Sequence, residues 1–72
     1  MSVDVRQYTR VIIRKNNDYL VGRQMFSRQL KWSTSPWDAW WTRDAEVARN
    51  VAKATGGTAV LFNPVVGRTV VL

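Results

Sequence analysis

Four tryptophans lie within ten residues of this 72-residue chain: Trp32, Trp37, Trp40 and Trp41. Indole rings are costly to expose to water, and they are frequent at the energetic centres of binding surfaces. The cluster is therefore either the centre of a small core or the working surface of a binding module.

A second group of chemically capable residues alternates along the first third of the chain. A two-residue hairpin turn at Asn16-Asn17 would pair Arg14 with Tyr19 and Arg10 with Arg23 on one face of a sheet, whereas a longer turn would change this register. Arginines interleaved with aromatic rings on an open sheet face hold phosphates and stack bases. Directly opposed arginines repel each other, and a bound anion relieves that repulsion. The alternative is an ordinary solvated sheet face.

Three of the tryptophans follow a helical spacing. Trp37, Trp40 and Trp41 are related as i, i+3 and i+4, and they share one face if this stretch is helical. A core this small needs the volume of two or three indoles. One ring, Trp37 or Trp40, is expected to be exposed in a patch with Lys31 and Arg28, as an anchor for a protein or a platform for a base. A fully structural cluster is the alternative.

Catalytic chemistry has little support. The chain has no histidine and no cysteine, which removes the commonest general base and the strongest nucleophile. The five acids have structural explanations, since Asp18 lies in a turn, Asp4 near the N-terminus, and Asp38, Asp44 and Glu46 at helix starts. We therefore predict a protein that is not an enzyme and that binds no metal, cofactor or small-molecule substrate.

The charge is strongly positive and uneven. The net charge is +6, and residues 1–34 contribute seven lysines and arginines against two acids. Such asymmetry favours an anionic partner, either a nucleic acid or an acidic protein surface, with solubility alone as the alternative. A membrane partner is not expected, because the apolar side of the predicted helix carries only small residues.

The length predicts one small domain over residues 1–72, with residues 1–7 frayed. A chain this short buries only about 60% of its unfolded surface, and without cysteine it depends on aromatic packing or oligomerisation. The absence of cysteine, of a signal peptide and of a long apolar run favours a complete, soluble, cytoplasmic protein.

The elements that would position these side chains follow from periodicity and turn residues. Strands are expected at 8–14, 19–24, 29–33, 58–63 and 68–72, and Gly22 is expected to mark a bulge or a close backbone approach. A short helical turn is expected at 36–40 and the main helix at 43–55, capped by Thr42 and ended by Gly56-Gly57. One continuous helix from Pro36 is the alternative.

The fold class predicted from this order is α+β. An antiparallel sheet of four to five strands, ordered β-β-β-α-β-β along the chain, would carry the main helix packed on one face. The side with Val11, Ile13 and Leu20 is apolar and suits the helix.

Most of the chain also resembles a group of known proteins. The pattern that carries the likeness is Tyr19-Leu20, Trp32, Asp38-Ala39, Ala45, Val51-Ala52, Gly56-Gly57 and Val60. It resembles small uncharacterised α+β proteins encoded by phages and prophages. The resemblance implies a mobile-element accessory protein that acts by binding; some proteins of this kind inhibit host defence enzymes and others bind DNA. It implies no functional residue.

We therefore expect a non-catalytic protein that binds nucleic acid through a basic and aromatic sheet face. The alternative is a protein-binding inhibitor or adaptor that uses the tryptophan cluster and its basic rim. A third possibility is a homodimer that forms through the C-terminal strand. The candidate binding residues are Arg10, Arg14, Tyr19, Arg23, Arg28, Lys31, Trp37 and Trp40.

Overall fold

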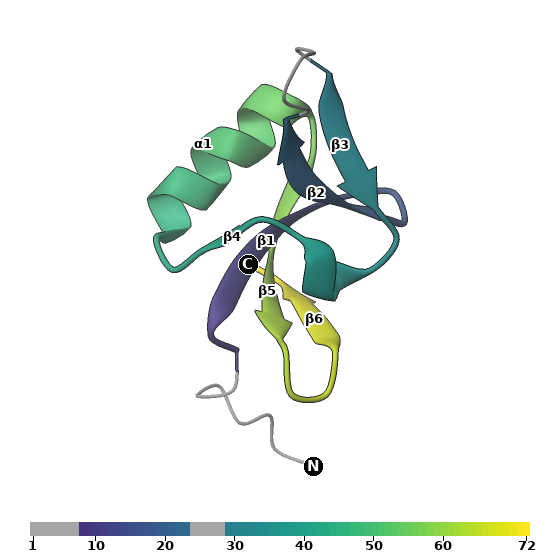
Figure 1. The fold of residues 1–72 in the computed structure, drawn as a ribbon. Coiled ribbons are helices and arrows are strands. Elements are labelled where there is room, and N and C mark those ends of the chain that lie inside the picture. Colours follow the sequence, from purple (N-terminus) through teal and green to yellow (C-terminus); the bar gives the residue numbers. More distant parts are fainter. Residues whose placement is uncertain (1–7, 24–28) are drawn as a thin grey trace.

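A computed structural model describes residues 8–23 and 29–72 of the chain (Figure 1). The strands are β1 (Arg10–Lys15), β2 (Asp18–Arg23), β3 (Leu30–Ser33), β4 (Trp41–Thr42), β5 (Thr58–Asn63) and β6 (Arg68–Val71), the helix is α1 (Ala45–Thr55), and a 3₁₀ turn, η2, spans Pro36–Asp38. All five predicted strands are present, and their ends differ from the prediction by at most two residues. The predicted fraying of residues 1–7 lies outside the described residues.

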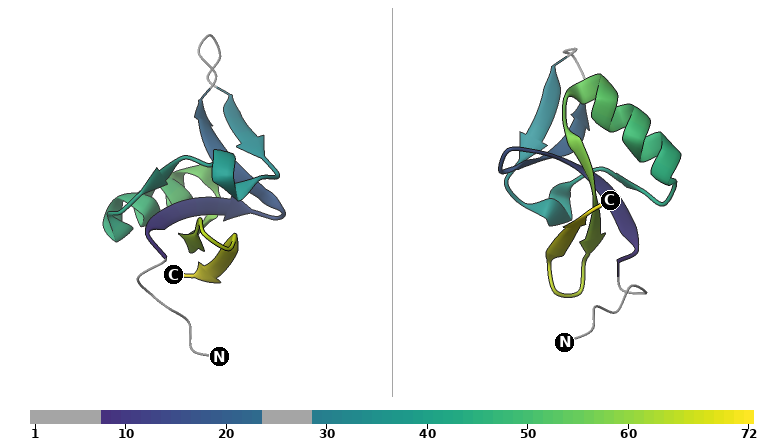
Figure 2. Two further views of the ribbon diagram at one scale, coloured as in Figure 1. Left: turned by 60° about the horizontal axis from the view of Figure 1, so that its bottom comes forward. Right: turned by 180° about the vertical axis from the view of Figure 1, so that it is seen from behind.

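The strands form one antiparallel sheet in the order β3-β2-β1-β5-β6, and β4 pairs with β1 beside this path. The single helix α1 packs against the sheet, as the two further views in Figure 2 also show. The α+β class is therefore confirmed. The sheet has six strands where four to five were predicted, because the two residues of β4 add a short strand.

The hairpin β1–β2 begins as predicted and then opens. Asn16 has φ 56°, the left-handed conformation that a two-residue turn requires, and Arg14 pairs with Tyr19. The described ladder between the two strands has only one further pair. The expected pairing of Arg10 with Arg23 is wrong, because the described β1–β2 ladder ends at Arg14 and β4 pairs with β1 beyond it.

The segment before the helix fills the opening between β1 and β2. The N–H of Trp40 donates to the carbonyl of Leu20 at 2.8 Å, and the next two residues form β4. Trp41 pairs with Ile12 of β1, and Thr42 pairs with Val11. This segment therefore replaces β2 as the neighbour of the first half of β1.

The helix starts two residues later than predicted. Asp44, instead of Thr42, is the N-cap, and its side chain accepts hydrogen bonds from the N–H groups of Glu46 and Val47. The Thr42 hydroxyl accepts from the N–H of Asp44, so it fixes the cap residue. The helix ends as predicted at Gly56, with φ 74°.

The stretch before β4 is not a continuous helix. Its helical part is limited to η2, and Ala39 after it is already extended with ψ 144°. The alternative of one helix from Pro36 is therefore wrong, and the predicted helical turn over 36–40 ends at residue 38. The bulge predicted at Gly22 is confirmed by a register shift between β2 and β3 and by φ 149°.

The sheet has an apolar cluster on each face. The helix side holds Val11, Ile13, Leu20, Ala48, Ala52 and Ala59, as the alternation along the hairpin predicted. The opposite side holds Ile12, Ala39, Val60 and Phe62, with Tyr19 packed against them. Since η2 leads into Ala39, the segment around this turn covers the middle of the second face. Among the described residues, no helix has the length and apolar character needed to cross a membrane.

Candidate functional site

The predicted open basic face is interrupted at its centre. Arg10, Ile12 and Arg14 point to the same side of β1, so the two arginine Cα atoms lie about 13 Å apart along the strand. Ile12, midway between them, is fully buried beneath Ala39. Tyr19 beside Arg14 is half-buried and packs on the same cluster. The expectation of a continuous solvated arginine and tyrosine surface is therefore wrong, although Arg10 and Arg14 share a face.

The remaining predicted cations are spread over the molecule. Lys31 is exposed on the edge strand β3, opposite Gly22. The backbone of Arg23 pairs with Leu30, and its side chain lies outside the described part of the chain. Arg28 also lies outside the described residues. The structure therefore does not test the patch expected around Arg28.

Trp37 is exposed, but its polar group and its ring edge are already engaged. Its indole N–H donates to the carbonyl oxygen of Pro64 at 3.0 Å, and its ring meets Phe62 edge to face with centroids 5.5 Å apart. These contacts join η2 to the β5–β6 hairpin. The structure therefore gives Trp37 a clear packing role, although 53% of it remains exposed.

Trp40 is the predicted site residue that faces the core. It is half-buried and packs against the helix-side cluster. It also borders an apolar hollow with residues of β2, β3 and α1. Its ring supports the hydrophobic core, so it is a poor candidate for a free binding anchor.

The most chemically distinctive group on the surface centres on Trp41. The guanidinium carbon of Arg10 lies 4.9 Å from the centroid of the Trp41 ring, and that of Arg43 lies 5.8 Å away. Trp41 is 41% exposed, and Arg43 is also exposed. We refer to Arg10, Trp41 and Arg43 as the Trp41 cluster.

The fold fixes each member of the Trp41 cluster through its neighbours. Trp41 follows Trp40, whose N–H is bonded to β2, and it pairs directly with Ile12. Arg43 lies between Thr42, which pairs with β1, and Asp44, which caps α1. Arg10 begins β1 and pairs with β5. Only the outer parts of these side chains are free to move toward a ligand.

The local electrostatics favour an anion. Within the described residues, neither Arg10 nor Arg43 has an ion-pair partner. Because both guanidinium groups lie against one ring, their charges are within about one Debye length of each other, roughly 10 Å at 0.1 M salt.

A shallow hollow of about 390 Å³ borders the Trp41 cluster. Arg43 lines it together with Tyr8, Thr9, Val11 and Leu61. Val11 and Leu61 belong to the helix-side cluster, whereas Trp41 lies on the face of Ile12, so Arg43 is the member of the Trp41 cluster that lines this hollow.

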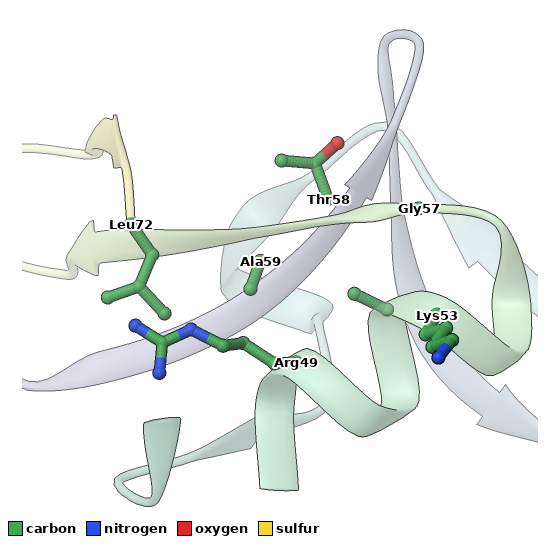
Figure 3. A pocket seen from close by; sticks show the side chains of 7 residues that line it. Arg49, Lys53, Gly57, Thr58, Ala59 and Leu72 are labelled. Atoms are coloured by element: carbon green, nitrogen blue, oxygen red, sulfur yellow. The ribbon is translucent and has the colours of Figure 1, made fainter. Parts of the chain in front are cut away.

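A second basic hollow lies between α1 and the end of the chain (Figure 3). Arg49 and Lys53 of α1 border it opposite Leu72, and its volume is about 330 Å³. The other residues that line it are small: Ala52, Gly57, Thr58 and Ala59. Among the described residues, no aromatic ring lines this hollow, so it can attract an anion but offers no surface on which a base could stack.

Trp41 belonged to the tryptophan cluster noted in the sequence, but neither Trp41 nor Arg43 was among the candidate binding residues. The helical spacing grouped Trp41 with Trp40, whereas an extended backbone sends adjacent side chains to opposite faces. Recognising a strand at residues 41–42 would have separated the two rings. A strand of two residues is too short to show the alternation of apolar and polar residues by which strands are predicted.

In the described part of the chain, no three acidic side chains gather where a metal ion could bind. Neither a family model, nor a curated protein, nor a solved structure matches this chain.

Proposed function

We propose that the protein binds single-stranded nucleic acid without catalysis, and that the Trp41 cluster is its contact site. The observation that carries this proposal is the placement of two guanidinium groups against one partly exposed indole. An aromatic ring next to arginines combines a stacking surface for a base with partners for its phosphates.

A base stacked on Trp41 is expected to contribute more binding free energy than the arginine contacts already present on this ring. An exposed cation–π contact contributes about 0.5–1 kcal/mol. A base stacked on an aromatic side chain contributes about 1–3 kcal/mol. A base on the free part of Trp41 can therefore displace an arginine from the ring, and the displaced guanidinium can then bind a phosphate oxygen.

Single strands are favoured over duplexes because the bases of a duplex are already stacked on one another. A contact through one indole and two arginines also reads no base edge, so little sequence preference is expected. Ile12 lies between Arg14 and Arg10 and is buried together with Ala39. Arg14 is therefore separated from the Trp41 cluster and is at most a secondary phosphate contact.

Fluorescence anisotropy with labelled oligonucleotides tests this proposal. We expect a single strand to bind more tightly than a duplex of the same length, with affinity that falls as salt rises. Trp41→Ala is expected to weaken binding by about 5- to 150-fold, which corresponds to the stacking energy of one base, and Trp41→Phe to keep most of it. Unchanged binding by the folded Trp41→Ala variant would overturn the proposal.

A protein-binding inhibitor or adaptor is the second candidate, and an exposed apolar patch favours it. Val65 and Val66 in the β5–β6 turn are 71% and 57% exposed, and Trp37 contacts the same turn through Pro64. A Val66→Asn variant separates the candidates, because it removes an exposed apolar side chain without changing the charge: it should weaken capture of a protein partner and leave oligonucleotide binding unchanged. A phage or prophage origin is part of both proposals and rests on the resemblance alone.

A further inference from the structure

The free edge of β6 carries unusually little protection. β6 is the last strand of the sheet, and in the described part of the chain it pairs with β5 alone (Figure 1). Edge strands are commonly protected by charged side chains, proline or bulges. Here the strand has one charged residue, Arg68, followed by Thr69, Val70 and Val71.

The opposite edge of the sheet is protected in the usual way. β3 has four residues, one of which is the exposed Lys31, and its pairing with β2 is interrupted by the bulge next to Gly22. The two edges therefore differ in their protection against edge-to-edge association. Of the two, β6 is the edge that presents a regular apolar strand.

The direction of the free backbone groups on β6 follows from its hydrogen bonds. The N–H of Leu72 donates to the carbonyl of Ala59, and antiparallel ladders alternate bonded and non-bonded pairs. Leu72, Val70 and Arg68 therefore turn their backbone groups toward β5. Thr69 and Val71 turn theirs outward, to the free edge.

These outward groups are complementary to those of a second copy. If two β6 strands pair antiparallel about a two-fold axis at Val70, Thr69 of each copy lies opposite Val71 of the other. Each of these two pairs exchanges two hydrogen bonds, so four bonds form in total. Arg68 faces Leu72 of the second copy, so the two Arg68 side chains are not directly opposed.

The side chains on this strand also favour a second copy. Val70, Val71 and Leu72 are 43%, 61% and 39% exposed. In the paired form the two Val70 side chains meet directly at the axis, where cross-strand neighbours come closest. Apolar surface on both faces of the strand is then removed from water.

We propose that the chain forms a two-fold homodimer by antiparallel pairing of β6 with β6 of a second copy, in the register that places Val70 opposite Val70. A strand of this length buries less than the roughly 1,000 Å² of a stable interface, so we expect a transient dimer. Its population should rise over about 10 μM to 1 mM protein.

The dimer has a consequence for binding that rests on the proposed function. A two-fold axis perpendicular to the sheet keeps each face on its own side, so both Trp41 clusters lie on the same face of the joined sheet. Trp41 points to this face because it pairs with Ile12. A long single strand can then contact both clusters and gain affinity that a short one lacks.

Cysteine cross-linking tests the register directly, because the natural chain has no cysteine. Val70→Cys places two thiols at the axis, within reach of a disulfide, whereas Val66→Cys places a more exposed thiol in the turn. We expect Val70→Cys to form the covalent dimer at least about tenfold faster than Val66→Cys under mild oxidation. Equal rates would overturn the proposed pairing.

Charge complementation provides an independent test by sedimentation velocity. Val70→Glu and Val70→Lys should each stay monomeric at concentrations where the natural chain associates, and their equimolar mixture should associate again. If either variant fails to fold, Val71→Pro removes only an outward donor and should also give a monomer. Association that survives Val71→Pro, or a mixture that stays monomeric, contradicts the proposal.

The same variants test the proposed dimer and the proposed function independently of each other. Val71→Pro should leave binding of a short oligonucleotide unchanged and weaken binding of a long one. Trp41→Ala should leave self-association unchanged. A monomeric chain that still binds oligonucleotides would refute the dimer alone, and a dimer without binding would refute the proposed function alone.

Discussion

The ring of Trp37 lies directly over Gly67. A Cβ added to Gly67 would collide with Cη2 of the indole and lie 2.8 Å from Cζ2. Gly67 also has φ 77°, a conformation that L-residues rarely adopt. Together with the hydrogen bond from Trp37 to Pro64, this contact makes the β5–β6 turn and η2 one packed unit.

The first prediction concerns this contact. Gly67→Ala should lower the free energy of unfolding by about 2–4 kcal/mol, because the left-handed backbone costs about 1–2 kcal/mol and the indole must also leave its position. For a domain of this size, that loss corresponds to a decrease in Tm of very roughly 8–30 °C, which thermal denaturation by circular dichroism measures.

Gly56→Ala is the matched control for this prediction. Gly56 has nearly the same backbone conformation, φ 74°, and a Cβ there would meet only the flexible end of Lys15 at 3.7 Å. Its cost should be limited to the backbone conformation, about 1–2 kcal/mol. Equal losses for the two variants would show that the Trp37 ring does not rest on Gly67 in solution.

Much of the fold could be predicted because its signals are local. Asn16 adopts the positive φ that a two-residue turn needs, and Gly56 ends the helix in the expected conformation. The strand β4 could not be predicted in this way. It forms because β1 and β2 separate beyond the Arg14–Tyr19 pair and leave the edge of β1 open to Trp41 and Thr42. That condition depends on the whole sheet.

The second prediction concerns the start of α1. Asp44→Ala should lower the free energy of unfolding by about 1 kcal/mol, because two helix N–H groups lose the carboxylate that accepts their hydrogen bonds. Asp38→Ala removes the same charge from the exposed turn η2, where Asp38 occupies no N-cap, and should cost almost nothing. Urea denaturation of both variants measures the difference, and equal midpoints would contradict this assignment of the cap.

The candidate site was harder to predict than the fold. Arg10 was identified because it alternates with apolar residues along a strand, a pattern visible in the sequence. The separation of Trp40 from Trp41 depends on whether residues 39–42 are extended or helical, and the spacing of the tryptophans favoured the wrong choice. The alternation predicted that the face with Arg10, Ile12 and Arg14 is open to solvent. In the structure Ala39 packs on Ile12, so the middle of this face is buried.

The third prediction separates these adjacent rings. Trp40→Ala should destabilise the protein by about 2–4 kcal/mol, because this ring packs against the helix-side cluster. Trp41→Ala should cost about 1 kcal/mol, since much of this ring is exposed and its arginine contacts are weak. Chemical denaturation of the two variants provides the comparison. A larger loss for Trp41→Ala would mean that this ring is structural and unsuited to a ligand.

The last prediction concerns the charges of the Trp41 cluster. The logarithm of the association constant should fall linearly with the logarithm of salt concentration, with a slope of about −0.7 for each phosphate contacted. Arg10→Gln and Arg43→Gln should therefore each reduce the magnitude of that slope by about 0.7 if each guanidinium binds one phosphate. Lys53→Gln removes the same charge from an exposed residue of α1, which has no cation–π contact among the described residues, and should lower affinity slightly with an unchanged slope. An anisotropy titration at several salt concentrations measures all three. If Lys53→Gln changes the slope as much as the two arginine variants do, binding depends on net charge, and the Trp41 cluster has no special part in it.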